Sequence, residues 1–229
     1  MYYLGYGGQY GLLFLGILIT LGAQLLVSAS YSKYSKKNNS KCLTGSEVAR
    51  KILDKNGLSN VYVVEQPGHL TDHYDPTRKV VRLSSHVFHG KSIASLAVAA
   101  HECGHAIQDK NNYVPMRMRS LIIPAVNFSS YAGYFAIIIS FVTGNNKLFW
   151  AGIIMLCIIL LFQLITLPVE FNASNRALKK IQEYKLVDNN DLEGSKKMLT
   201  AAALTYVASV ATVVLQILRL ILLHGNRRD

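Results

Sequence analysis

The chain has 229 residues, enough for one or two ordinary soluble domains. Its composition argues against a soluble protein, because 51% of the residues are hydrophobic, only 16% are charged and the mean hydropathy is +0.24. The formal net charge is +11, yet most basic residues border apolar stretches, where they attract anionic lipid headgroups. We therefore expect membrane lipids as partners and no nucleic acid.

Four apolar stretches reach the length of about 20 residues that a helix needs to cross a bilayer. They are residues 10–30, 121–142, 148–167 and 198–223. The first three contain no charged residue, and the fourth continues past Arg219. No basic residue precedes the first stretch, as a cleaved secretory signal would require, so we expect it to remain as a span. The sequence predicts four transmembrane helices and two larger hydrophilic regions, 31–120 and 168–197.

Lysine and arginine are distributed unevenly between the two sides of the predicted membrane. Regions 31–120 and 168–197 hold many basic residues next to the spans, whereas the opposite side has only Lys147, Arg227 and Arg228. The positive-inside rule then places both regions in the cytoplasm of a bacterial-type plasma membrane. Because two crossings separate the regions, they lie on one side, and a residue of the second could complete a site in the first.

The first hydrophilic region contains the run His101-Glu102-Cys103-Gly104-His105. Ser92 and the segment after it, rich in Ala and Leu, predict a helix from Ser92 to about Gln108. Residues four apart share a helix face, so the two imidazoles could hold one Zn²⁺ ion. Glu102, rotated away from that face, could take a proton from the attacking water as a general base. The alternative is a helix with two incidental histidines.

Ahead of this helix the sequence predicts a helix and two strands. Thr44 to Glu47 resembles a capping box that opens a helix, which Gly57 would end. Residues 61–64 and 79–83 are expected to form strands on either side of a polar loop. An exposed strand beside the metal helix could pair with an extended peptide substrate. Alternatively, the strands only pack a small sheet against that helix.

A catalytic zinc ion usually has three protein ligands, and Glu170 is the expected third one. Position 111 is Asn, so a third histidine six residues after His105 is absent. Glu170 follows the third span directly, where we expect a helix to restart with Pro168 in its first turn. The alternative is a carboxylate that is favoured at a helix start by the helix dipole.

Four segments occur in order along the chain: DHYDP (72–76), SIASLAVAA (92–100), HECGHAIQ (101–108) and LPVEFNASNRAL (167–178). Together they resemble the YugP-type family of neutral zinc membrane metallopeptidases, over nearly the whole chain. The resemblance implies a gluzincin-like site in which His101, His105 and Glu170 hold one zinc ion per chain and Glu102 is the general base. It implies no defined substrate.

The surroundings of the ligands depart from a wider group of similar membrane zinc peptidases. There the ligand Glu begins a Glu-x-x-x-Asp pattern, but the fifth position here is Ser174. Asn172 also stands where many relatives of the closer family have Asp. We therefore expect Ser174, Asn172 or Arg176 to orient the ligands.

An oxyanion stabiliser is also expected in the polar loop. His73 or Tyr74 could donate a hydrogen bond to the charge that develops in the transition state. The alternative is that residues 72–75 form only a hydrogen-bonded turn.

The sequence thus predicts a mostly α membrane protein with four transmembrane helices and a small α+β zincin-like metallopeptidase module. The expected function is zinc-dependent endopeptidase activity on membrane-associated or unfolded proteins. The alternative is a non-enzymatic membrane scaffold or lipid-interacting protein with structural zinc or none. The physiological substrate and the oligomeric state are left open.

Overall fold

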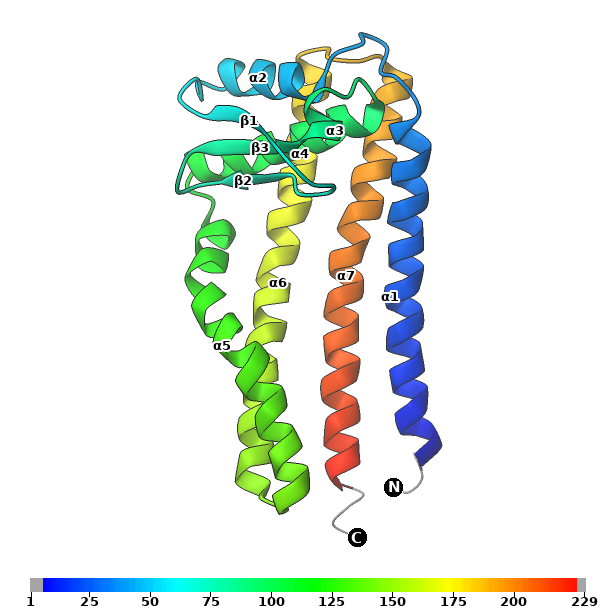
Figure 1. Ribbon diagram of the computed structural model, residues 1–229, viewed down its shortest axis with the longest axis vertical. Coiled ribbons are helices and arrows are strands. Elements are labelled where there is room, and N and C mark those ends of the chain that lie inside the picture. The colour runs from blue at the N-terminus through cyan, green and yellow to red at the C-terminus, as the bar shows by residue number, and fades with distance from the viewer. Residues whose placement is uncertain (1–5, 226–229) are drawn as a thin grey trace. The chain divides into compact units, whose positions relative to one another are not determined.

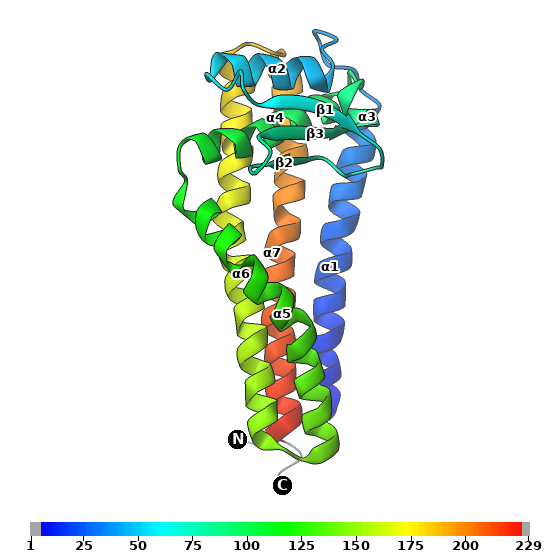
Figure 2. The ribbon, with the colours of Figure 1, turned by 60° about the vertical axis from the view of Figure 1, so that its left-hand side comes forward.

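The structure is a computed structural model and describes residues 6–225. Arg227 and Arg228, which entered the prediction of sidedness, lie outside this range. The chain divides into two compact units. Of the described residues, the helical unit comprises 6–24, 117–167 and 205–225, and the sheet unit comprises 25–116 and 168–204. Figures 1 and 2 show the elements of each unit.

Four helices are long and apolar enough to cross a membrane. They are α1 (Tyr6–Ser35), α5 (Val114–Thr143), α6 (Asn146–Glu183) and α7 (Asn189–Gly225). Each contains one predicted span and continues beyond it. The prediction of a mostly α membrane protein is confirmed.

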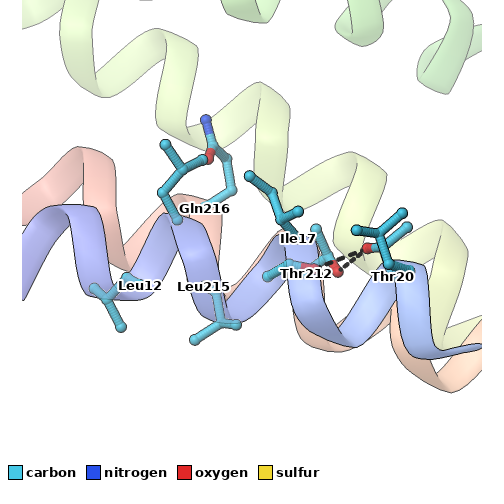
Figure 3. Close-up of a pocket in the computed structure, with 9 residues that line it drawn as sticks. Leu12, Ile17, Thr20, Thr212, Leu215 and Gln216 are labelled. Carbon is cyan, nitrogen blue, oxygen red and sulfur yellow. Dashed lines mark hydrogen bonds between the residues drawn. The ribbon is translucent and has the colours of Figure 1, made fainter.

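Small residues and polar side chains bring helices together within the helical unit. A Cβ atom on Gly152 of α6 would lie 2.9 Å from the Gly133 carbonyl oxygen of α5, so the absence of side chains permits this close approach. The Thr20 hydroxyl of α1 lies 3.0 Å from that of Thr212 of α7 (Figure 3). Between apolar helices, such a hydrogen bond supplies specificity that hydrophobic burial in lipid cannot.

The sheet unit contains three strands and three shorter helices. They are α2 (Gly45–Lys55), β1 (Tyr62–Gln66), β2 (His73–Asp75), β3 (Val80–Ser84), α3 (Ser85–Phe88) and α4 (Ile93–Lys110). The strand order is β1-β3-β2, with β1 parallel and β2 antiparallel to β3. The prediction of a small α+β module is confirmed, although β2 and α3 were not expected. Strand β2 is three residues long within a polar loop and is defined by its pairing with β3.

Helix α2 begins and ends as its sequence predicts. The Thr44 side chain accepts from the Glu47 backbone N–H, and the Glu47 carboxylate accepts from the Thr44 N–H, which completes the capping box. After the helix, Gly57 has a φ of +63°, a conformation that glycine adopts without strain. Val48 and Ile52 are fully buried in the core shared with α4.

Helix α6 does not restart at Pro168 as expected but runs without a break through it. Proline removes one backbone hydrogen bond from a helix interior, which bends or weakens the helix without always ending it. Leu, a strong helix former, occurs repeatedly before Pro168, and the helix continues to Glu183. Glu170 is therefore an interior residue of the same helix that contains the third predicted span.

Candidate metal centre

Helix α4 places His101 and His105 on one face, as the spacing predicts. The Ser92 side chain caps the helix by accepting from the Ser95 N–H. The two histidines lie one turn apart, with ring centroids 4.8 Å from each other and ring planes at 85°. Both rings can therefore direct a nitrogen toward a common point.

Glu170 of α6 brings its carboxylate to that point. Its Oε2 atom lies 3.3 Å from His101 Nε2 and 3.6 Å from His105 Nε2. A tetrahedral zinc ion with bonds of about 2.0–2.1 Å places neighbouring ligand atoms about 3.3 Å apart. Two imidazole nitrogens and one carboxylate oxygen also match the donors of catalytic zinc sites, which leave a fourth position open. The residues present therefore fit a zinc ion.

Gly104 explains how α6 can come so close to α4. A Cβ atom at this position would lie 2.4 Å from the Ala173 carbonyl oxygen, so only glycine fits without a shift of the backbone. Ala173 is fully buried and lies one turn after Glu170. The contact between Gly104 and Ala173 therefore sets the distance between the two histidines and the carboxylate.

Each imidazole is also held through its other nitrogen. His101 Nδ1 lies 3.1 Å from Ser174 Oγ, and His105 Nδ1 lies 3.0 Å from Gln108 Oε1. With Nδ1–H donating to these oxygens, the Nε2 lone pairs face Glu170, which is the tautomer that a metal ligand needs. The structure places Ser174 beside His101. Gln108 was not identified as a site residue from the sequence.

Asn172 and Arg176 are connected to His105 through Gln108. The Gln108 amide N–H donates to the Val169 carbonyl at 2.7 Å and to Asn172 Oδ1 at 3.1 Å. Arg176 Nε donates to the same Asn172 oxygen at 2.6 Å. Gln108 is fully buried and lies one turn after His105. The helix pattern could have indicated that it lies near this histidine, but it could not have indicated its partners on α6.

Glu102 lies beside the histidines and is 8% exposed as a residue. Within residues 6–225 it makes no hydrogen bond or ion pair, although it lies close enough to His105 to affect the pKa of that imidazole. Buried carboxylates are usually hydrogen-bonded, so an unpaired one in this position is unusual. Its oxygens remain available to a water molecule or a substrate.

His73 and Tyr74 lie on β2, next to α4, but no hydrogen bond joins either of them to His101, His105 or Glu170 in the described part of the chain. The Tyr74 hydroxyl donates to Asp109 Oδ2 at 2.7 Å. Burial, followed by this bond to Asp109, raises the pKa of Tyr74. His73 is exposed, and its Nδ1 lies 2.8 Å from the Thr71 carbonyl.

The family described as "Putative neutral zinc metallopeptidase" matches residues 9–225. The chain belongs to this family. A relative from Bacillus subtilis (strain 168), named "Putative membrane protease YugP", is 45% identical over 211 residues, which cover 92% of this chain and 94% of the relative. A comparison with solved structures gives no significant match.

Because the chain belongs to a zinc peptidase family, the cluster of His101, His105 and Glu170 is a candidate zinc site. Burial alone would lower the pKa of His105, but the hydrogen bond that the protonated ring donates to Glu170 and the negative charges of Glu102 and Glu170 raise that pKa above its ordinary value. A site that attracts a proton in this way also attracts a cation, which takes the proton's place. Cys103 takes no part, because burial raises the pKa of its thiol and its sulfur faces the Ala49 carbonyl.

Proposed function

We propose that the chain is a membrane-embedded, zinc-dependent endopeptidase that cleaves membrane-associated or unfolded proteins. The observation that supports this most directly is that Glu170 Oε2 lies 3.3 Å from His101 Nε2 and 3.6 Å from His105 Nε2, with all three ligand atoms within 4.8 Å of one another. In this gluzincin-like arrangement the three residues hold one ion per chain.

Each residue around the site has its own role in the proposed peptide hydrolysis. When bound, zinc polarises the scissile carbonyl and acidifies a water molecule. Glu102 takes the proton from the attacking water and passes it to the leaving amine. Ser174 and Gln108 keep the two imidazoles turned with Nε2 toward Glu170. His73, whose side chain is exposed on β2, is the better placed of the two proposed oxyanion donors, since Tyr74 already donates to Asp109.

Strand β2 offers a place for the substrate backbone. It lies at one edge of the sheet, paired only with β3 within the described residues, and it packs against α4. An extended peptide added to the outer edge of β2 would gain backbone hydrogen bonds whatever its sequence. This mode of binding suits unfolded substrates.

The position of Glu170 favours substrates close to the bilayer surface. It follows the apolar stretch 148–167 by three residues on the same helix, an axial distance of about 4.5 Å. We propose that the site faces the cytoplasm, since both hydrophilic regions are rich in basic residues. Equal cleavage rates for soluble unfolded protein and for the same segment tethered to a membrane would argue against a preference for the interface.

The experiment that tests the proposed chemistry is Glu102→Gln in the full chain purified in detergent. The amide keeps the shape of the side chain but cannot accept the proton, so we expect bound zinc to remain and cleavage of an unfolded reporter to fall by roughly 10²–10⁴-fold. Glu65→Gln, an exposed substitution in β1, is the matched control and should keep full activity. Full activity in Glu102→Gln would overturn the role of Glu102.

A further inference from the structure

A groove separate from the metal centre lies in the sheet unit, between the C-terminal part of α1 and the N-terminal part of α7. Its volume is about 650 Å³, and all of its lining residues come from these two helices. The two segments run antiparallel next to each other, as both ribbon views show (Figures 1 and 2). None of the lining residues belongs to the zinc cluster or its hydrogen-bond partners.

The two walls of the groove change in chemical character at matching levels. Leu26 of α1 and Leu204 of α7 line the apolar end, and both are exposed. One turn along each helix, the hydroxyl groups of Ser30 and Thr200 follow.

One further turn along, the groove ends in lysines. Lys33 on α1 and Lys196 and Lys197 on α7 line this end. Each wall therefore passes from leucine through a hydroxyl to lysine over two turns, an axial distance of about 10 Å. The same order of apolar, polar and cationic groups matches a phospholipid, from acyl chain through ester linkage to phosphate.

The lysine end has an excess of positive charge. Lys197 pairs with Glu193 at 2.6 Å, and both side chains are exposed. Within the described part of the chain Lys33 and Lys196 make no ion pair, and Lys33 lies over the ring of Tyr34 at 5.5 Å. Glu193 also interacts electrostatically with Lys196, so this end holds three ammonium groups against one carboxylate, and an external anion would be stabilised there.

The base of the groove is fixed by contacts between the same two helices. Tyr34 is 8% exposed and packs on Gly194, where an added Cβ would lie 2.9 Å from the ring. Just beyond the end of α1, Lys37 forms an ion pair with the buried Asp191 at 3.1 Å. The groove therefore keeps its shape without a ligand, which reduces the entropy lost on binding.

We propose that this groove binds one anionic phospholipid, with the phosphate between Lys33 and Lys196 and an acyl chain along Leu26 and Leu204. A zwitterionic lipid is disfavoured, because its own ammonium group would meet the lysines. A soluble anion would leave the apolar end of the groove unfilled. The proposal does not depend on peptidase activity, since no residue of the metal centre takes part.

The test is native mass spectrometry of the full-length protein in detergent, titrated with phosphatidylglycerol or with phosphatidylcholine of the same acyl chains. We expect one tightly retained phosphatidylglycerol and no comparable retention of phosphatidylcholine. The double substitution K33Q/K196Q removes two charges worth about 1 kcal/mol each, so phosphatidylglycerol affinity should fall roughly 30-fold. The control K36Q/K179Q changes the same net charge at exposed positions outside the groove and should bind like the wild type.

A second variant tests the apolar half without a change of charge. Ala29 is exposed and lines the groove, so Ala29→Phe should fill it and weaken phosphatidylglycerol binding at least tenfold, while zinc content stays unchanged. Wild-type lipid affinity in K33Q/K196Q, or equal retention of the two lipids, would overturn the proposal. Binding of glycerol phosphate as tight as that of the lipid, unaffected by Ala29→Phe, would overturn it too, because the groove would then be a site for soluble anions.

Discussion

At the scale of single residues, the two histidines of the candidate metal centre have neutral hydrogen-bond partners. Ser174 Oγ accepts from His101 Nδ1–H. A hydroxyl fixes the ring orientation but adds no negative charge, so it makes the imidazole a less basic ligand than a carboxylate would. His105 is held in the same neutral way by Gln108.

Ser174→Ala should weaken zinc binding because His101 Nδ1 loses its partner and the ring is no longer held. Loss of such a contact typically lowers metal affinity by roughly 10–100-fold. Competition with a chromophoric chelator in detergent measures the affinity. Ser35→Ala, at an exposed position with only a local backbone bond, serves as the control. An unchanged affinity in Ser174→Ala would show that this hydroxyl does not orient the ligand.

Sequence reasoning proposed the two histidines and Ser174 as site residues but did not propose Gln108. The histidines follow from helix periodicity alone, because residues four apart share a face. Gln108 acts by bridging His105 to the Val169 carbonyl and Asn172, and this requires α6 to lie against α4. The local sequence pattern around Gln108 gives no information about this contact between α4 and α6.

At the scale of elements, the close approach of α4 and α6 is the decisive contact. Strand β2 and the continuity of α6 through Pro168 were both missed, because each depends on neighbours rather than on local propensity. The pairing of β2 with β3 stabilises three residues in a segment that otherwise has loop composition. The capping box of α2 and the four apolar spans depend on local sequence alone, and they were predicted correctly.

Gly104→Ala should separate the two helices that share the metal site. The added methyl group would meet the Ala173 backbone at 2.4 Å, and overpacking of this kind costs about 1–3 kcal/mol of stability. Since Glu170 lies one turn before Ala173, we expect zinc affinity to fall at least roughly tenfold. Gly22→Ala, where a Cβ atom meets nothing within 4 Å, is the control. Wild-type zinc affinity in Gly104→Ala would contradict the role given to this contact.

At the scale of the whole molecule, the four long apolar helices require a definite sidedness. The native cysteines offer a test, because Cys42 is exposed in the first hydrophilic region, Cys103 is buried and Cys157 lies in an apolar part of α6. Two membrane crossings separate residues 31–120 from residues 168–197, so both regions lie on the same side of the membrane. A metal cluster built from residues of both regions requires this. The assignment of that side to the cytoplasm comes from the distribution of basic residues.

In a Cys157→Ser background, a membrane-impermeant maleimide should leave Cys42 unmodified in intact bacterial cells and modify it after the membrane is opened. A cysteine placed by Asn145→Cys, in the hairpin between α5 and α6, should react in intact cells. The reverse pattern would place the metal site outside the cytoplasm without affecting the argument for the site itself.

The central claim is that Glu170 completes a zinc site with His101 and His105. The most direct test is the zinc affinity and stoichiometry of detergent-purified wild type, Glu102→Gln and Glu170→Gln. We predict one zinc ion per chain in the wild type and in Glu102→Gln, and for Glu170→Gln a loss of affinity larger than the roughly 100-fold that changes outside the ligand set reach. Wild-type zinc affinity in Glu170→Gln would contradict the account.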